Sequence, residues 1–301
     1  MNQASKIAIP ESSTLTEVLA GTMRTGIAAA VSLLMMTFAA APGAAETITV
    51  AEGIVYGDLP RQKLDLYRPA KGGANAPILV FLYGGGWERG DRVDLRETGE
   101  ALAAAGLIVA VPDYRLYPEA VFPEFVEDCA LAVAHVWRTV RAADGAPRPI
   151  FVGGHSAGAF NAAMLALDDR YLSDAGVPPG ALAGAVLLSG PYDMSGPLRS
   201  PFSRIFPRPD RDRADAADFV NGEDPAILLL TVDADDTVDP RSTFRLAGAI
   251  GTGGGNVVVG AYRGQSDHLA TFLGLADPNS TVRRDLEGFI AAALRQWRQR
   301  P

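Results

Sequence analysis

Residues 150–167 read IFVGGHSAGAFNAAMLAL, and this stretch decides the fold class. A buried strand is expected at 150–152, and it leads through a glycine-rich turn into an apolar helix over 157–167. The turn contains GHSAG at 154–158, the only G-x-S-x-G sequence in the chain. A serine in such a strained turn needs small neighbours so that the chains can pass each other. The context therefore predicts that Ser156 is a nucleophile rather than an ordinary serine of a glycine-rich turn.

Strands and helices alternate on both sides of this turn. This order predicts one α/β domain over 46–301, with about eight strands in a mostly parallel twisted sheet and helices on both faces. The segment 195–224, rich in Pro, Arg and Asp, breaks the alternation and is either a small lid over the site or a surface excursion. The expected strands are 48–56 and 63–67 (an antiparallel pair), 77–82, 107–111, 150–152, 185–188, 226–232 and 257–262. The expected helices are 93–105, 122–141, 157–167, 241–250 and 282–297.

A serine hydroxyl needs a base to remove its proton, and the chain has three histidines. His155 adjoins the nucleophile, and its side chain is expected to point away from the pocket. His135 lies on the helix 122–141, upstream of Ser156, and is expected to be a surface or half-buried residue. His268 follows the last predicted strand and alone satisfies the order serine, acid, histidine. It is therefore the predicted base.

The acid that orients this histidine is expected just after the strand 226–232. Four aspartates lie there within seven residues, and Asp267 beside the histidine is a further option. Adjacent residues seldom orient each other in this way, so Asp267 is the weaker candidate. Local composition does not choose among the other four, which are Asp233, Asp235, Asp236 and Asp239.

A glycine run, Gly84-Gly85-Gly86, follows the strand 77–82. Glycines let the backbone approach a substrate oxygen with its N–H groups exposed, so the run is a candidate oxyanion hole. A phosphate-binding loop is the rival interpretation. No Gly-Lys-Ser/Thr follows, and Arg89 stands where G-x-G-x-x-G requires glycine, so a dinucleotide is not expected. The serine mechanism needs neither an organic cofactor nor a metal.

Charge and cysteine content narrow the functional classes. The formal net charge is -8 and the basic residues are dispersed, which argues against a nucleic-acid partner and leaves a small molecule. The single cysteine, Cys129, permits no internal disulfide and no cysteine metal cluster. Cys129 falls on the apolar face of the helix 122–141 and is expected in the core.

The first 45 residues have the pattern of a secretory signal peptide. The apolar run 27–41 follows Met23-Arg24 and leads into small residues at 39–45. We expect 1–45 to be a signal peptide or leader, and the mature chain to be periplasmic or secreted without stable membrane insertion. Glu11 and Glu17 fit an n-region badly, so either Met23 is the true start or the leader is unusually long. The alternative is an uncleaved anchor at 27–41, although this run is shorter than the about 20 residues of a span.

With these residues in hand, the chain resembles the esterase/lipase branch of the α/β-hydrolases. It is similar to carboxylesterases grouped with hormone-sensitive lipase, to arylformamidases, and to bacterial feruloyl and acetylxylan esterase domains. The resemblance runs from about Val55 to Arg298. Its motifs are KLDLYRP at 63–69, YGGGW at 83–87 with Gly90-Asp91, DYRL at 113–116, GHSAG at 154–158 and SGPYD at 189–193.

The resemblance implies the α/β-hydrolase fold and a carboxylesterase that cleaves small or medium acyl esters through an acyl-enzyme. The family register after the strand 226–232 makes Asp235 the triad acid, with Asp236 as runner-up. In the glycine motif Tyr83 replaces the family's usual histidine, which braces the loop, so the loop geometry is in question. By similarity, the oxyanion donors are the N–H groups of Gly85, Gly86 and Ala157. Candidate pocket residues are Gly84, Trp87 and His155, although Trp87 could equally be core packing.

Two rival functions remain. An arylformamidase would use the same machinery on an N-formyl aromatic amine. A catalytically silent binding protein typically lacks a triad member, and none is missing from this sequence.

Overall fold

The structure is a computed structural model that describes residues 48–71, 73–141 and 145–299. The predicted leader, 1–45, lies outside the described residues. Glu46–Pro301 groups as one compact unit.

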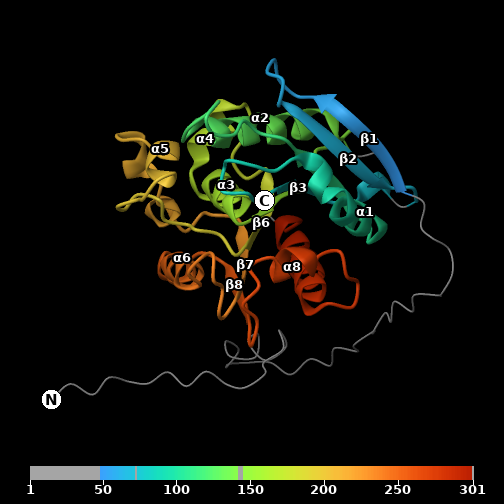
Figure 1. Ribbon diagram of the computed structural model, residues 1–301. Coiled ribbons are helices and arrows are strands. Elements are labelled where there is room, and N and C mark those ends of the chain that lie inside the picture. The colour runs from blue at the N-terminus through green and yellow to red at the C-terminus, as the bar shows by residue number, and fades with distance from the viewer. Residues whose placement is uncertain (1–47, 72, 142–144, 300–301) are drawn as a thin grey trace. The chain divides into compact units, whose positions relative to one another are not determined.

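Within the described residues, eight strands form one sheet in the order β1-β2-β4-β3-β5-β6-β7-β8 (Figure 1). β1 and β2 are antiparallel to each other, β2 is antiparallel to β4, and the remaining pairs are parallel. Every residue of β3 to β7 is buried, as expected for parallel strands covered on both faces. This architecture confirms the predicted fold class. The strands are β1 (Ile48–Val55), β2 (Lys63–Pro69), β3 (Ile78–Leu82), β4 (Ile108–Pro112), β5 (Ile150–His155), β6 (Leu182–Leu188), β7 (Ala226–Val232) and β8 (Val257–Tyr262).

Helices cover both faces of the sheet (Figure 1). α1 (Arg96–Ala104) and α8 (Thr281–Trp297) share one face, where the Arg283 guanidinium donates to the Ala101 carbonyl oxygen at 2.8 Å. The other face carries α2 (Glu124–Thr139), α3 (Ala157–Leu167) and α6 (Arg241–Thr252). No helix in the described part of the chain is long and apolar enough to cross a membrane.

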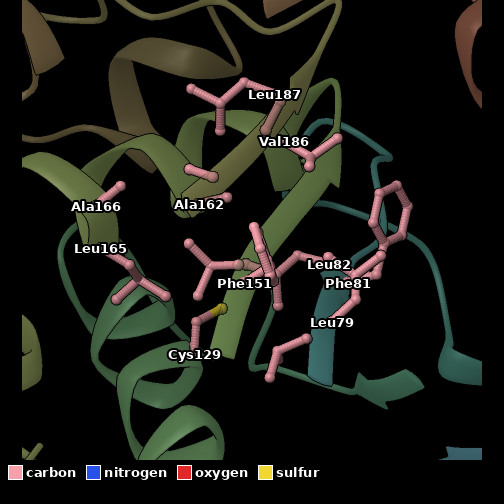
Figure 2. Packing of buried hydrophobic residues seen from close by; sticks show 14 of the residues in the cluster. Leu79, Phe81, Leu82, Cys129, Phe151, Ala162, Leu165, Ala166, Val186 and Leu187 are labelled. Carbon is pink, nitrogen blue, oxygen red and sulfur yellow. The ribbon is translucent and has the colours of Figure 1, made fainter. Parts of the chain in front are cut away.

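The hydrophobic core occupies both faces of the sheet, and Figure 2 shows the part that lies between the strands and the helices α2 and α3. All eleven residues of α3 are buried, because this helix is sandwiched between the sheet and α2. Cys129 of α2 is fully buried, which confirms its predicted place in the core, and burial raises the pKa of its thiol well above the usual range. A buried, protonated thiol is no nucleophile.

The segment 195–224 folds into three short helices rather than an unstructured excursion. They are α5 (Phe202–Ile205), η4 (Asp210–Arg213) and η5 (Ala216–Phe219). Phe206 is fully buried, and the carbonyl oxygen of Ile205 accepts a hydrogen bond from the Phe122 N–H at 2.8 Å. The segment is thus packed onto the fold. The remaining short elements are η2 (Gly73–Asn75), η3 (Arg92–Leu95), α4 (Asp169–Asp174) and α7 (Ala270–Leu273).

Candidate active site

The predicted nucleophile occupies a strained turn between β5 and α3. Ser156 has φ 55° and ψ −122°, a backbone conformation that L-residues rarely adopt, and it is partly exposed. A Cβ atom on Gly154 would lie 2.4 Å from the carbonyl of Gly158, and one on Gly158 would lie 2.2 Å from the Leu82 oxygen. Both glycines are therefore required, for the reason that the G-x-S-x-G pattern suggested.

Asp235 and His268 meet at the carboxyl edge of the sheet. Asp235 follows β7 and His268 follows β8, and the two strands are parallel neighbours. His268 Nδ1 lies 2.8 Å from Asp235 Oδ2, and the aspartate side chain is fully buried. Asp235 Oδ1 accepts the N–H groups of Thr237 and Val238, each at 2.9 Å. A carboxylate fixed in this way accepts from Nδ1–H, so the lone pair of His268 is left on Nε2, where a base needs it.

The other candidate aspartates serve local turns or face solvent. Asp236 accepts from the hydroxyl of Thr237, Asp239 pairs with Arg241, and Asp267 accepts the N–H of Leu269. Asp233 is exposed. Among the five candidates, Asp235 is the one that the structure brings to His268, in agreement with the register implied by the family resemblance.

His155 links the nucleophile turn to the loop that carries His268. Its ring lies 4.6 Å from the His268 ring, centroid to centroid, and its Nε2 is 2.9 Å from the backbone oxygen of His268. His155 is only 4% exposed, and burial, reinforced by the nearby His268, lowers its pKa to about 4. His268 Nε2 is itself buried and has no hydrogen-bond partner among the described residues. Because His155 directly precedes Ser156, the predicted nucleophile and base lie on contacting segments.

The glycine run after β3 lies against the same turn. A Cβ atom on Gly84 would be 3.0 Å from Ser156 Cβ, so the two backbones approach closely here. Gly85 and Gly86 have φ of 119° and 64°, values that favour glycine. Within the described part of the chain, the backbone N–H groups of Gly86 and Ala157 donate to no other backbone group. Ala157 begins α3, where backbone N–H groups have no partner within the helix.

Tyr83 braces this loop in place of the family's histidine. Its ring stacks on Tyr114 with centroids 4.5 Å apart, and its hydroxyl accepts from the Arg61 guanidinium at 2.9 Å. The same guanidinium donates to the carbonyl oxygen of Gly90 at 2.7 Å. The Tyr114 hydroxyl donates to the backbone carbonyl oxygen of Tyr83, also at 2.7 Å. The loop is therefore held from both ends by a network that the glycine motif alone did not reveal.

The candidate pocket residues behave differently from one another. Trp87 is 1% exposed, its Nε1–H donates to Asn161 at 2.9 Å, and aromatic rings surround it. Of the two roles expected for Trp87, core packing is therefore the one that the structure shows. His155 is buried as well, whereas Gly84 is partly exposed.

His135 is half-buried on α2, as predicted. No cluster of three or more metal-ligating side chains occurs among the described residues.

A serine on a strained strand–helix turn, within this strand order, defines the class: the chain has the α/β-hydrolase fold. The sequence model of the BD-FAE family matches residues 64–178. A truncated carbohydrate esterase from gut microbiota superposes with a TM-score of 0.70 at 21% identity, covering 84% of this chain and 98% of that chain.

Several curated relatives match by sequence, among them a methylesterase and a formamidase. The probable isoprenylcysteine alpha-carbonyl methylesterase ICME of Oryza sativa subsp. japonica is 38% identical over 119 residues, which are 40% of this chain and 29% of that relative. The kynurenine formamidase of Danio rerio is 28% identical over 141 residues, 47% of this chain and 46% of that relative. The chain thus spans less than half the length of either relative. These matches confirm the predicted resemblance to the esterase branch of the α/β-hydrolase superfamily and support a hydrolase of the esterase kind.

Proposed function

We propose that the protein is a serine hydrolase that cleaves carboxylic esters of small or medium acyl groups through an acyl-enzyme. The observation that carries this proposal is the hydrogen bond between His268 Nδ1 and the buried Asp235 carboxylate, on a loop that contacts the Ser156 turn. A fixed tautomer with a free Nε2 is what a serine needs from its base. The esterase relatives support the same reaction class.

The chemistry follows from these groups. Ser156 Oγ attacks the acyl carbonyl carbon while His268 Nε2 takes the hydroxyl proton, and the buried Asp235 carboxylate stabilises the imidazolium that forms. The N–H groups of Gly85, Gly86 and Ala157 would donate to the oxygen of the tetrahedral intermediate. His268 then gives the proton to the leaving alkoxide, and water releases the acid by the reverse sequence of steps.

A substrate panel tests this proposal. Purified 46–301 should hydrolyse p-nitrophenyl acetate and butyrate, and Ser156→Ala should reduce turnover to background. The matched control is Ser242→Ala, because Ser242 lies on α6 and its hydroxyl is engaged by the N–H of Tyr192. Equal turnover by Ser156→Ala and the parent chain would overturn the assignment of the nucleophile.

A formamidase is the second candidate, because kynurenine formamidases are among the relatives. The same triad would attack an N-formyl carbonyl and protonate an aromatic amine. The panel therefore includes an N-formyl aromatic amine beside the esters. A kcat/KM for the formamide well above that for every ester would favour this alternative.

We also propose that residues 1–45 direct export and that 46–301 is the mature domain. The support is the signal-like apolar run 27–41 in the sequence. N-terminal sequencing of the protein recovered from the periplasm or medium tests this proposal. An intact N-terminus on cytosolic protein would contradict export, and one on membrane-bound protein would favour the anchor at 27–41.

A further inference from the structure

We propose that Phe202 forms the wall of the acyl site and restricts the substrate to esters of short acyl groups; this inference rests on the proposed function. Phe202 is the first residue of α5, in the segment that breaks the strand–helix alternation. Phe202 belongs neither to the proposed triad nor to the proposed oxyanion hole. Its position beside the glycine loop is what assigns it a role.

The Phe202 ring lies beside the glycine loop, near enough that a side chain at position 86 would touch it. A Cβ atom built on Gly86 would lie 3.9 Å from Phe202 Cε1, which is ordinary van der Waals contact. The ring also meets the indole of Trp87 edge to face, with centroids 6.1 Å apart and planes at 87°. Phe202 is 36% exposed, so part of its apolar ring is open to a substrate bound beside the glycine loop.

The C-terminal end of α5 is packed against the protein, and this packing holds the backbone that carries Phe202 in place. Phe206, one turn further on, is fully buried and lies 4.8 Å from the Trp87 ring and 5.3 Å from the Phe122 ring. The Phe122 N–H donates to the carbonyl oxygen of Ile205 at 2.8 Å. These contacts tie α5 to the same aromatic cluster that supports the glycine loop.

The reaction decides which part of the substrate meets this wall. An oxyanion held by Gly86 lies about 3 Å from that N–H, so groups on the carbonyl carbon are within reach of the ring. The leaving oxygen must face His268 Nε2, which protonates it. Figure 1 shows α5 well away from β8, the strand that leads to His268. The acyl group is therefore the part that is left to face Phe202.

An acyl-length series tests the inference on p-nitrophenyl acetate, butyrate and octanoate. The parent chain should prefer acetate and butyrate, and Phe202→Ala should raise the kcat/KM ratio of octanoate to acetate at least about tenfold, within what small apolar groups contribute in a pocket. Phe202→Trp should lower the ratio of butyrate to acetate. Phe244→Ala is the matched control, because that phenyl lies on α6 and is 50% exposed.

Phe202→Leu guards against a folding artefact, since it keeps an apolar side chain and should give an intermediate ratio at an unchanged melting temperature. An unchanged ratio in Phe202→Ala, with the ester activity of the parent chain present, would overturn this inference alone. A parent chain that neither hydrolyses the esters nor reacts with a fluorophosphonate would overturn the proposed function, and this inference with it.

Discussion

The Nε2 atom of His155 lies 2.9 Å from the backbone oxygen of His268. A carbonyl oxygen only accepts, so His155 carries its proton on Nε2 and donates. The donor adjoins Ser156, the proposed nucleophile, and the acceptor belongs to His268, the proposed base. This hydrogen bond fixes the loop of His268 relative to the turn of Ser156, which makes His155 a positioning residue.

Replacing His155 separates this role from mere packing. His155→Leu should lower kcat by about ten- to a hundredfold, the range expected when a reacting group moves by about 1 Å, with KM little changed. His155→Gln keeps an N–H donor and should recover most of the loss. Steady-state kinetics on both variants test this prediction, and equal activity of the two would contradict the role of the hydrogen bond.

His155 should also make stability depend on pH. Burial lowers its pKa from the usual 6.5 to about 4, so between these values the unfolded chain binds the proton and the folded chain does not. The contribution of His155 to the free energy of unfolding is then fully present above pH 6.5. It is lost as the pH falls toward 4, by on the order of 3 kcal/mol. Urea unfolding at pH 7.0 and 4.5 measures this loss. His155→Gln should show a smaller loss over the same interval, and an identical loss would contradict the prediction.

Asp235 and Asp236 form a matched pair of adjacent carboxylates. Asp235→Asn should reduce kcat by about 10⁴-fold, because an amide in this place favours the wrong tautomer of His268. Asp236→Asn should stay within about twofold, since Asp236 is exposed and accepts a hydrogen bond from the neighbouring Thr237 hydroxyl. Turnover numbers for p-nitrophenyl acetate decide between them. A reversed order would make Asp236 the triad acid.

Glycine substitutions test the close packing beneath the nucleophile turn. Gly158→Ala should cost several kcal/mol or prevent folding, because its Cβ would lie 2.2 Å from the Leu82 oxygen. Gly248→Ala is the control, since a Cβ there meets nothing within 4 Å and the site is exposed on α6. It should stabilise the protein by up to about 1 kcal/mol. Thermal unfolding of both variants measures the difference, and similar melting temperatures would contradict the account of the turn.

Much of the fold could be predicted from the spacing of apolar residues and from the glycines and prolines that end strands and helices. The bounds predicted for α3, β7 and β8 agree with the structure at both ends. Errors lie where tertiary contacts decide: β5 continues three residues past Val152, because its pairing with β6 runs on to His155 and Leu188. The predicted helix 93–105 splits into η3, capped by the Asp91 side chain, and α1. The short helices α4 and α7 were not predicted, because helices of six and four residues carry too little periodicity.

For the site, the order of motifs indicated Ser156 and His268, but local composition left four aspartates open. The family register, and then the hydrogen bond of Asp235, singled out one. The contacts of His155 and Phe202 were not predictable, because each joins segments far apart in the chain; His155 and His268 are 113 residues apart. The one available signal for Phe202 in the sequence was its place in the segment 195–224, which breaks the alternation of strands and helices.

The most direct test of the central claim is covalent labelling with a fluorophosphonate, followed by intact mass and peptide mapping. Folded 46–301 should gain one phosphonyl adduct on the peptide that contains Ser156, and the labelling rate should fall by orders of magnitude in His268→Ala. Ser156→Ala should gain none. Equal labelling of Ser156→Ala, or no labelling of the folded parent chain, would contradict the account.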